Sequence, residues 1–173
     1  MISDKEKGIL FWITGLSGAG KTSISSKIYH RIKSKYGKTL YINGDEMRKI
    51  FDLKSYDNAD RKRGGIKYSK LFKKITDQNI NVLFAGMALF DDVRIWNRKN
   101  IKNYLEIYIK TSLKNIIKNK YTKVYKKKTK LVGIDIKPEF PKKPDIIINN
   151  NFNKSIEKLS NELILKINKN IKI

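Results

Sequence analysis

The run Gly15-Leu-Ser-Gly-Ala-Gly-Lys-Thr22 constrains the fold of this chain more than any other feature. It fits the pattern G-x-x-x-x-G-K-[ST], and it follows an apolar stretch, GILFWIT, at 8–14. After it, from 21 to about 35, isoleucines recur at helical spacing. A glycine-rich loop between a strand and a helix is the setting that a phosphate-binding loop requires. The sequence therefore predicts an α/β fold with a nucleoside-triphosphate site.

The glycines of such a loop let successive backbone N–H groups point inward at a phosphate, and the following helix adds the partial positive charge of its N-terminus. We expect Lys21 to reach the β- and γ-phosphates and the Thr22 hydroxyl to hold Mg²⁺. ATP and Mg²⁺ are therefore the expected cofactors. The predicted ATP-binding residues are Gly15, Ser17, Gly18, Ala19, Gly20, Lys21, Thr22 and Ser23.

Apolar runs alternate with amphipathic stretches along the rest of the chain, which is typical of a parallel sheet covered by helices. A last amphipathic helix begins near Ile156. The Gly64-Gly65 pair lies within one of the expected helices, where each glycine costs about 1 kcal/mol. Further strands are expected at 38–43, 81–87, 104–109 and 145–149, and further helices at 45–51 and 59–76.

The composition excludes several kinds of protein. Cysteine is absent, so disulfides and thiolate chemistry play no part. No stretch approaches the roughly 20 apolar residues of a membrane span, and the first residues, MISDKEKG, lack the apolar core of a signal peptide. We expect a single domain, residues 1–173, in a cytoplasmic protein with no membrane partner. A homodimer is the one oligomer that we consider for it.

The net charge of +23 raises the question of nucleic acid as a partner. Only six of the 39 basic residues are arginine, and the lysines are mixed with many Ile and Asn residues, as nucleotide bias in the coding genome produces. We favour this explanation, together with a small polyanionic substrate. The alternative is an ATP-binding protein that holds single strands with the Lys- and Tyr-rich segment 118–130.

Asp45, in the stretch NGDEMR at 43–48, is the predicted catalytic acid on the acceptor side. It follows an expected strand, and ligands of open α/β sheets bind beyond the carboxyl ends of the strands. A carboxylate there can accept the proton of an attacking hydroxyl or hold a water of Mg²⁺. The alternative is that Asp45 caps the helix that follows, and the two roles are compatible.

Five ordered stretches resemble the adenylylsulfate kinase family. They are GLSGAGKT, NGDEMR, the segment from DNADRKR to KLF, FDDVRIWNR and GIDIKPEFPKKPD, and the similarity covers about residues 8 to 149. The resemblance implies a P-loop kinase fold: a five-stranded parallel sheet with helices on both faces and a basic lid at about 118–144. It also implies transfer of the γ-phosphate of ATP, with Mg²⁺, to the ribose 3′-hydroxyl of a small nucleotide.

Departures from the family pattern fall on the acceptor side. Arg48 matches the family, whereas Asn58 stands where the family has Arg and Arg61 where it has Asn. Ala88 replaces a serine, and Asp91 replaces an arginine. Two arginines still predict an anionic acceptor group. The acidic Asp91 favours a less anionic end, so we expect a cytidine nucleotide carrying a phosphoramidate, as in capsule-pathway members of the family, rather than adenylylsulfate.

The resemblance extends the acceptor site to the lid, where TKVYK and GID match family motifs. Near the site, Phe51, Tyr56 and Phe90 offer aromatic faces; packing is favoured for each, with stacking on a base as the alternative. No nucleic acid is expected as a partner. The predicted substrate-binding residues are Asp45, Arg48, Phe51, Asn58, Arg61, Met87, Ala88, Lys123, Gly133 and Ile134.

Overall fold

The computed structural model describes residues 7–119 and 132–171, and it contains one parallel sheet. The strand order is β2-β3-β1-β4-β5, so the strand that precedes the glycine-rich loop lies at the centre. Every pairing between neighbouring strands is parallel. This confirms the predicted five-stranded parallel sheet. The strands are β1 (Ile9–Thr14), β2 (Thr39–Asn43), β3 (Asn81–Ala85), β4 (Asn103–Lys110) and β5 (Ile146–Asn149).

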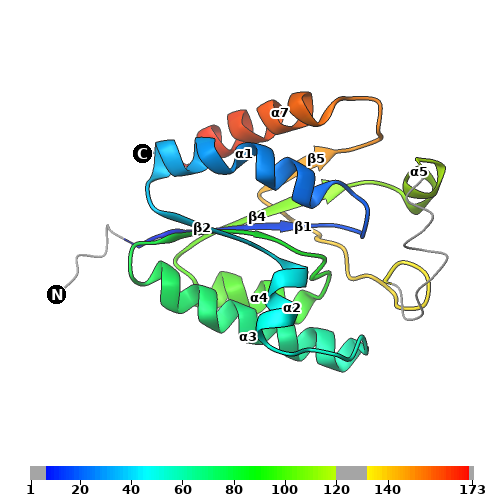
Figure 1. The fold of residues 1–173 in the computed structure, drawn as a ribbon, viewed down its shortest axis with the longest axis horizontal. Coiled ribbons are helices and arrows are strands. Elements are labelled where there is room, and N and C mark those ends of the chain that lie inside the picture. The colour runs from blue at the N-terminus through cyan, green and yellow to red at the C-terminus, as the bar shows by residue number, and fades with distance from the viewer. Residues whose placement is uncertain (1–6, 120–131, 172–173) are drawn as a thin grey trace.

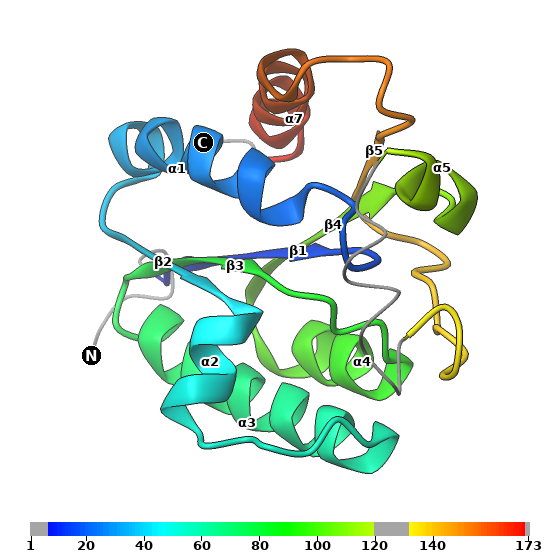
Figure 2. The same ribbon diagram turned by 45° about the vertical axis from the view of Figure 1, so that its right-hand side comes forward.

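Helices cover both faces of the sheet, as Figures 1 and 2 show. On one face lie α1 (Lys21–Tyr36) and α7 (Ile156–Asn170). The other face carries α2 (Gly44–Ile50), α3 (Asn58–Thr76) and α4 (Asp91–Asn100). The short α5 (Leu113–Lys118) follows the carboxyl end of β4. None of the helices in the described part of the chain is both long and apolar enough to span a membrane.

The two faces of β1 explain why its sequence is apolar throughout. Phe11 and Ile13 point into the core formed with α1 and α7. Leu10 and Trp12 point into the second core, which includes Phe72 of α3. A central parallel strand is buried on both faces, so it reads as a continuous apolar run rather than an alternating one.

Gly64 and Gly65 lie inside α3 rather than at a break in it. A Cβ atom on Gly65 would lie 2.7 Å from the Cγ2 atom of Val93 on α4, and one on Gly64 would lie 2.8 Å from Leu53 Cδ1. The pair therefore allows α3 to approach its neighbours closely. This close packing opposes the unfavourable helix propensity of the two glycines.

The sequence analysis missed α4 because the buried side of this helix is largely polar. Its buried residues are Val93, Arg94 and Asn97. An apolar stripe is the signal that identifies a helix from sequence, and in this helix it is short: Val93 and Trp96 pack into the core, whereas Ile95 is 64% exposed. Arg94 instead makes ionic and hydrogen-bonding contacts with Glu106 and with the carbonyl oxygen of Glu139.

The segment expected as a lid, about 118–144, contributes to the core through Val132. Val132 is buried against Leu16, Leu89 and Ile116, and it forms an isolated bridge with Ile136. Lys123 and the rest of 120–131 lie outside the described residues.

Candidate functional site

The glycine-rich loop connects β1 to α1 at the carboxyl edge of the sheet. Gly15 has a φ of 151°, and a Cβ atom there would lie 2.5 Å from the carbonyl oxygen of Ile109. Gly20, the N-cap of α1, is in the left-handed region with a φ of 91°. From the end of β5, Asn150 donates a hydrogen bond of 2.9 Å to the carbonyl oxygen of Ala19. Backbone geometry thus fixes the loop, and Asn150 is a support that the sequence analysis missed.

Lys21 begins α1 and is buried beneath the loop. Its Nζ atom donates a hydrogen bond of 2.7 Å to the carbonyl oxygen of Leu16. Burial lowers the pKa of Lys21 from 10.5 to about 8, and the nearby carboxylate of Asp45 offsets part of that effect. The ammonium group is therefore poorly solvated, which strengthens its attraction for a phosphate.

Thr22 and Ser23 are exposed at the start of α1, where no acidic side chain occupies the first turn. The Thr22 hydroxyl and the Asp45 carboxylate line the same cleft. Among residues 7–119 and 132–171, no three His, Cys, Asp or Glu side chains gather as a metal cage. This donor set fits Mg²⁺, which is commonly bound by one or two protein oxygens together with substrate phosphates.

Asp45 lies in the first turn of α2, but it does not cap the helix. The N-cap is Asn43, whose Oδ1 atom accepts hydrogen bonds of 3.0 Å from the backbone N–H groups of Asp45 and Glu46. The Glu46 carboxylate completes a capping box by accepting from the Asn43 backbone N–H at 2.8 Å. The capping role considered for Asp45 belongs to Asn43, so the exposed Asp45 carboxylate is left available for the cleft.

The cleft has a volume of about 620 Å³ and runs from the glycine-rich loop to α2, α3 and the segment after β3. It brings together many of the predicted site residues from separate parts of the sequence. Those that line it are Ser17, Gly18, Gly20, Lys21, Thr22, Ser23, Asp45, Arg48, Arg61, Met87 and Ala88.

Arg48 and Arg61 form the cationic end of this cleft. Their Cζ atoms lie 4.0 and 5.1 Å from the ring centroid of Tyr56, which also lines the cleft. Arg48 donates hydrogen bonds to the carbonyl oxygens of Leu53 and Ser55, and Arg61 Nε donates to that of Tyr56 at 2.8 Å. Burial, and then the charge of Arg48, lower the pKa of Arg61. Two adjacent, partly desolvated guanidinium groups suit an anionic ligand.

Several predicted acceptor residues do not line this cleft. Phe51 packs against the ring of Tyr68, with centroids 5.6 Å apart, which agrees with the packing role favoured for it. Gly133, with a φ of 100°, is also outside the lining, and Ile134 is 52% exposed. Phe90 does reach the cleft, but it is buried in the core beneath α3 and α4.

Asn58 and Asp91 line a neighbouring hollow, together with residues 135–140 and Lys142. The Asp91 carboxylate forms an ion pair with Arg94. Its negative charge is therefore compensated within the protein and lies outside the cleft that contains Arg48 and Arg61. The expected repulsion between Asp91 and an anionic acceptor end is not supported by this geometry.

The family model described as adenylylsulphate kinase matches residues 7–149 of this chain. Among curated proteins, the chain is 36% identical over 167 residues to a cytidine diphosphoramidate kinase of Campylobacter jejuni, covering 94% of this chain and 97% of the relative. It is 26% identical over 166 residues to an adenylyl-sulfate kinase of Clostridium kluyveri, covering 92% and 83%.

Among solved structures, the chain is similar to the APS kinase CysC of Mycobacterium tuberculosis in complex with AMPPNP and APS. The TM-score is 0.80 at 26% identity, with 93% of this chain and 98% of that chain covered. The likeness extends over nearly all of both chains.

Proposed function

Since the chain belongs to the adenylylsulfate kinase family and is a nucleotide kinase, we propose that it phosphorylates the ribose 3′-hydroxyl of cytidine diphosphoramidate with ATP. The attacking hydroxyl oxygen forms a bond to the γ-phosphorus while the bond from that phosphorus to the bridging oxygen breaks. ADP leaves, and the hydroxyl proton passes to the protein and then to solvent. We place the reaction in the cytoplasm and in capsular polysaccharide modification.

The residues of the cleft have distinct roles in this proposal. The loop amides and Lys21 hold the triphosphate and stabilise the charge that develops on the transferred group. Mg²⁺, held by the Thr22 hydroxyl, supplies further charge neutralisation when bound. Asp45 orients the acceptor hydroxyl and accepts its proton. Arg48 and Arg61 bind the anionic part of the acceptor and hold it for in-line attack.

The choice of acceptor rests chiefly on the 36% identity to the cytidine diphosphoramidate kinase over almost the whole of both chains. The adenylyl-sulfate kinase comparison gives 26%. Differences from the wider family include Arg61 and Ala88, which both line the cleft. The compensated charge of Asp91 makes no contribution to this choice. Adenylylsulfate is the alternative acceptor.

The test is a side-by-side measurement of phosphorylation with ATP and Mg²⁺, using cytidine diphosphoramidate, CDP and adenylylsulfate as acceptors. We expect kcat/KM for cytidine diphosphoramidate to exceed that for adenylylsulfate by at least about tenfold, or about 1.4 kcal/mol. A tenfold preference for adenylylsulfate would overturn the cytidine assignment. ATP turnover stimulated by oligonucleotides, and by none of the three nucleotides, would instead favour a nucleic-acid-binding protein.

A further inference from the structure

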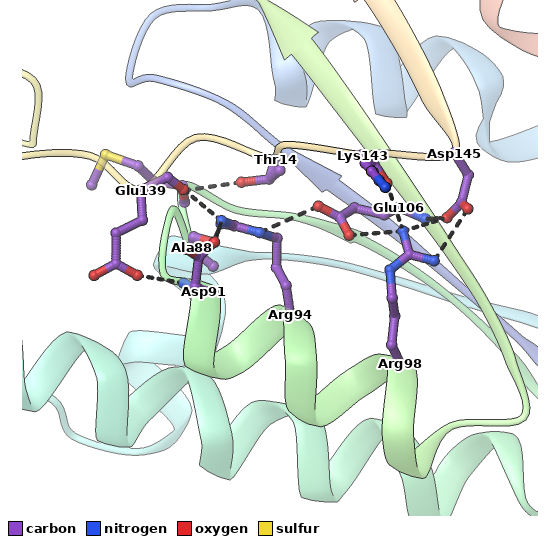
Figure 3. A network of polar contacts seen from close by, with 10 residues as sticks. Thr14, Ala88, Asp91, Arg94, Arg98, Glu106, Glu139, Lys143 and Asp145 are labelled. Carbon is purple, nitrogen blue, oxygen red and sulfur yellow. Dashed lines mark hydrogen bonds and ion pairs between the residues drawn. The ribbon is translucent and has the colours of Figure 1, made fainter.

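An ionic network that includes buried side chains lies between α4 and β4 (Figure 3). Arg94 of α4 and Glu106 of β4 have side chains only 5% and 4% exposed, and Arg94 Nε lies 3.3 Å from Glu106 Oε1. The other oxygen of Glu106 lies 3.0 Å from Arg98, one helical turn farther along α4. Arg98 also pairs with Asp145 at 3.1 Å.

Arg94 joins two irregular segments that follow different strands. Its guanidinium donates to the carbonyl oxygen of Glu139 at 2.6 Å and to that of Ala88 at 3.5 Å, and it pairs with the Asp91 carboxylate. The same segments are joined directly, because Glu139 N–H donates to the carbonyl oxygen of Leu89 at 3.0 Å. The Glu139 carboxylate accepts from the Asp91 backbone N–H at 2.5 Å.

This arrangement is costly to bury, so stability alone gives no reason for it. Desolvation of buried ion pairs commonly cancels their mutual attraction, and an apolar replacement of similar volume is often as stable. The carbonyl groups of Ala88 and Glu139, however, lie in half-buried segments outside any helix or strand, so no helical or sheet hydrogen bond provides them with a donor. Arg94 provides one to Ala88 and one to Glu139, and Glu106 fixes the direction from which it does so.

The supported segment forms part of the cleft wall. Gly86, Met87, Ala88 and Phe90 line the cleft, whereas neither Arg94 nor Glu106 does. Thr14, at the end of β1, holds the same segment from the other side by donating to the Met87 carbonyl oxygen at 3.1 Å. A shift of the Ala88 carbonyl would therefore move the cleft wall directly, whereas the glycine-rich loop contacts this segment through Leu16, which packs against Leu89, and through Thr14.

We propose that Arg94, oriented by Glu106, is a positioning residue that sets acceptor affinity by fixing residues 86–90. This inference rests on the proposed function, because it assumes that this wall contacts the acceptor nucleotide. It assigns no catalytic role to Arg94, which acts only through the backbone that it holds.

Arg98 provides a matched control. It pairs with the same Glu106 carboxylate from the same helix, so its loss also leaves that buried carboxylate with one partner fewer, although Arg98 itself is 42% exposed. Its remaining contacts, however, go to Asp145, to the carbonyl oxygen of Lys143 at 3.3 Å and to the ring of Tyr104, whose centroid lies 5.4 Å from Arg98 Cζ. Arg98 makes no hydrogen bond to residues 86–90 in the described structure.

The experiment compares full-length Arg94→Met and Arg98→Met with the unaltered protein. Amide hydrogen exchange is measured for 86–91 and for 141–146, and KM is measured for ATP and for cytidine diphosphoramidate. We expect Arg94→Met to speed exchange at 86–91 and to raise the acceptor KM about tenfold, since small displacements of positioning groups have effects of this order or larger. The KM for ATP should change less than twofold. In Arg98→Met, faster exchange should be confined to 141–146 and the acceptor KM should stay within twofold.

Equal rates of amide hydrogen exchange at 86–91 in Arg94→Met and in the unaltered protein would overturn the inference, whichever nucleotide is the acceptor. So would an equal rise in acceptor KM for both variants, because that would indicate a general loss of stability. If adenylylsulfate proves to be the acceptor, the proposed function fails in its substrate, and the same KM comparison is made with adenylylsulfate. If Arg94→Met does not fold, Arg94→Lys keeps the charge beside Glu106 while a single ammonium cannot span both carbonyls, and the same pattern of exchange and KM decides the matter.

Discussion

The glycine-rich loop and the acceptor wall form opposite sides of one cleft, but they are built in different ways. The loop is a continuous run from Gly15 to Thr22, held mainly by backbone geometry and by the start of α1. The acceptor wall combines side chains from α2 and α3 with the segment 86–90, all separated in the sequence. A substitution in the acceptor wall therefore leaves the continuous sequence of the loop unchanged, so the two sides of the cleft can be altered separately.

The largest effect is expected on the loop side, from Lys21→Ala. Lys21 provides charge to the transferred phosphate, so turnover should fall by about 10³-fold or more, as for other cations that stabilise phosphoryl transfer. The fold should persist, because the Lys21 side chain makes a single hydrogen bond in the described structure, to the carbonyl oxygen of Leu16, and its backbone contacts are kept in alanine. Steady-state kinetics and circular dichroism check both outcomes.

Lys27→Ala is the matched control for Lys21→Ala. Lys27 lies on the same helix, but its side chain is 59% exposed and pairs with Glu157. Turnover of this variant should be unchanged. Normal turnover in folded Lys21→Ala, or an equal loss in both variants, would contradict the role assigned to the loop.

A smaller effect is expected where the two sides meet, from Asp45→Asn. Loss of the proton acceptor should lower kcat by about 10²-fold or more, with little change in the KM for ATP. Stability should change by no more than about 0.5 kcal/mol, because Asn43 and Glu46 form the helix cap. Kinetics and thermal unfolding separate these two quantities.

Glu46→Gln removes the same charge one residue farther along α2 and keeps a side chain that can complete the capping box. Because Glu46 does not line the cleft, the kcat of the Glu46→Gln variant should be close to that of the unaltered protein. Normal kcat in Asp45→Asn accompanied by a lower melting temperature would assign Asp45 to structure instead of chemistry.

The smallest effect is expected on the acceptor wall alone, from Arg61→Ala. Loss of one charged hydrogen-bonding group should raise the acceptor KM about tenfold and leave the KM for ATP within twofold. Arg63→Ala, two residues along α3, is the control, since Arg63 is 72% exposed and pairs with Asp60. An equal rise in both variants would indicate a long-range charge effect, and a matching rise in the KM for ATP would show that the two sides are not separable.

The same contrast explains which features could be predicted from the sequence. The central strands and helices α1, α3 and α7 have apolar patterns that follow directly from burial, and the loop has a local motif. Helix α4 could not be recognised, because Arg94 and Asn97 occupy its buried side. Its contacts with Glu106 and with the carbonyl of Glu139 depend on the fold rather than on neighbouring sequence.

Placement of side chains on the acceptor side was also beyond a sequence argument. Asn58 and Arg61 are three residues apart on α3, yet Asn58 lines the neighbouring hollow and Arg61 lines the cleft. Asp91 was placed beside the acceptor by its position in a motif, whereas its direction is set by the ion pair with Arg94. The direction in which such a side chain points depends on the residue at which its helix begins and on the elements that the helix packs against.

The burial of Lys21 has a consequence for proton balance. With a pKa of about 8, this side chain is charged in about half of the free molecules at pH 8. A bound triphosphate favours the ammonium form and raises that pKa, so nucleotide binding at pH 8 takes up about half a proton from the buffer. The uptake vanishes well below pH 8, where the group is already protonated, and ATP affinity falls as the pH rises above 8. The measured enthalpy of nucleotide binding therefore depends on the ionisation enthalpy of the buffer.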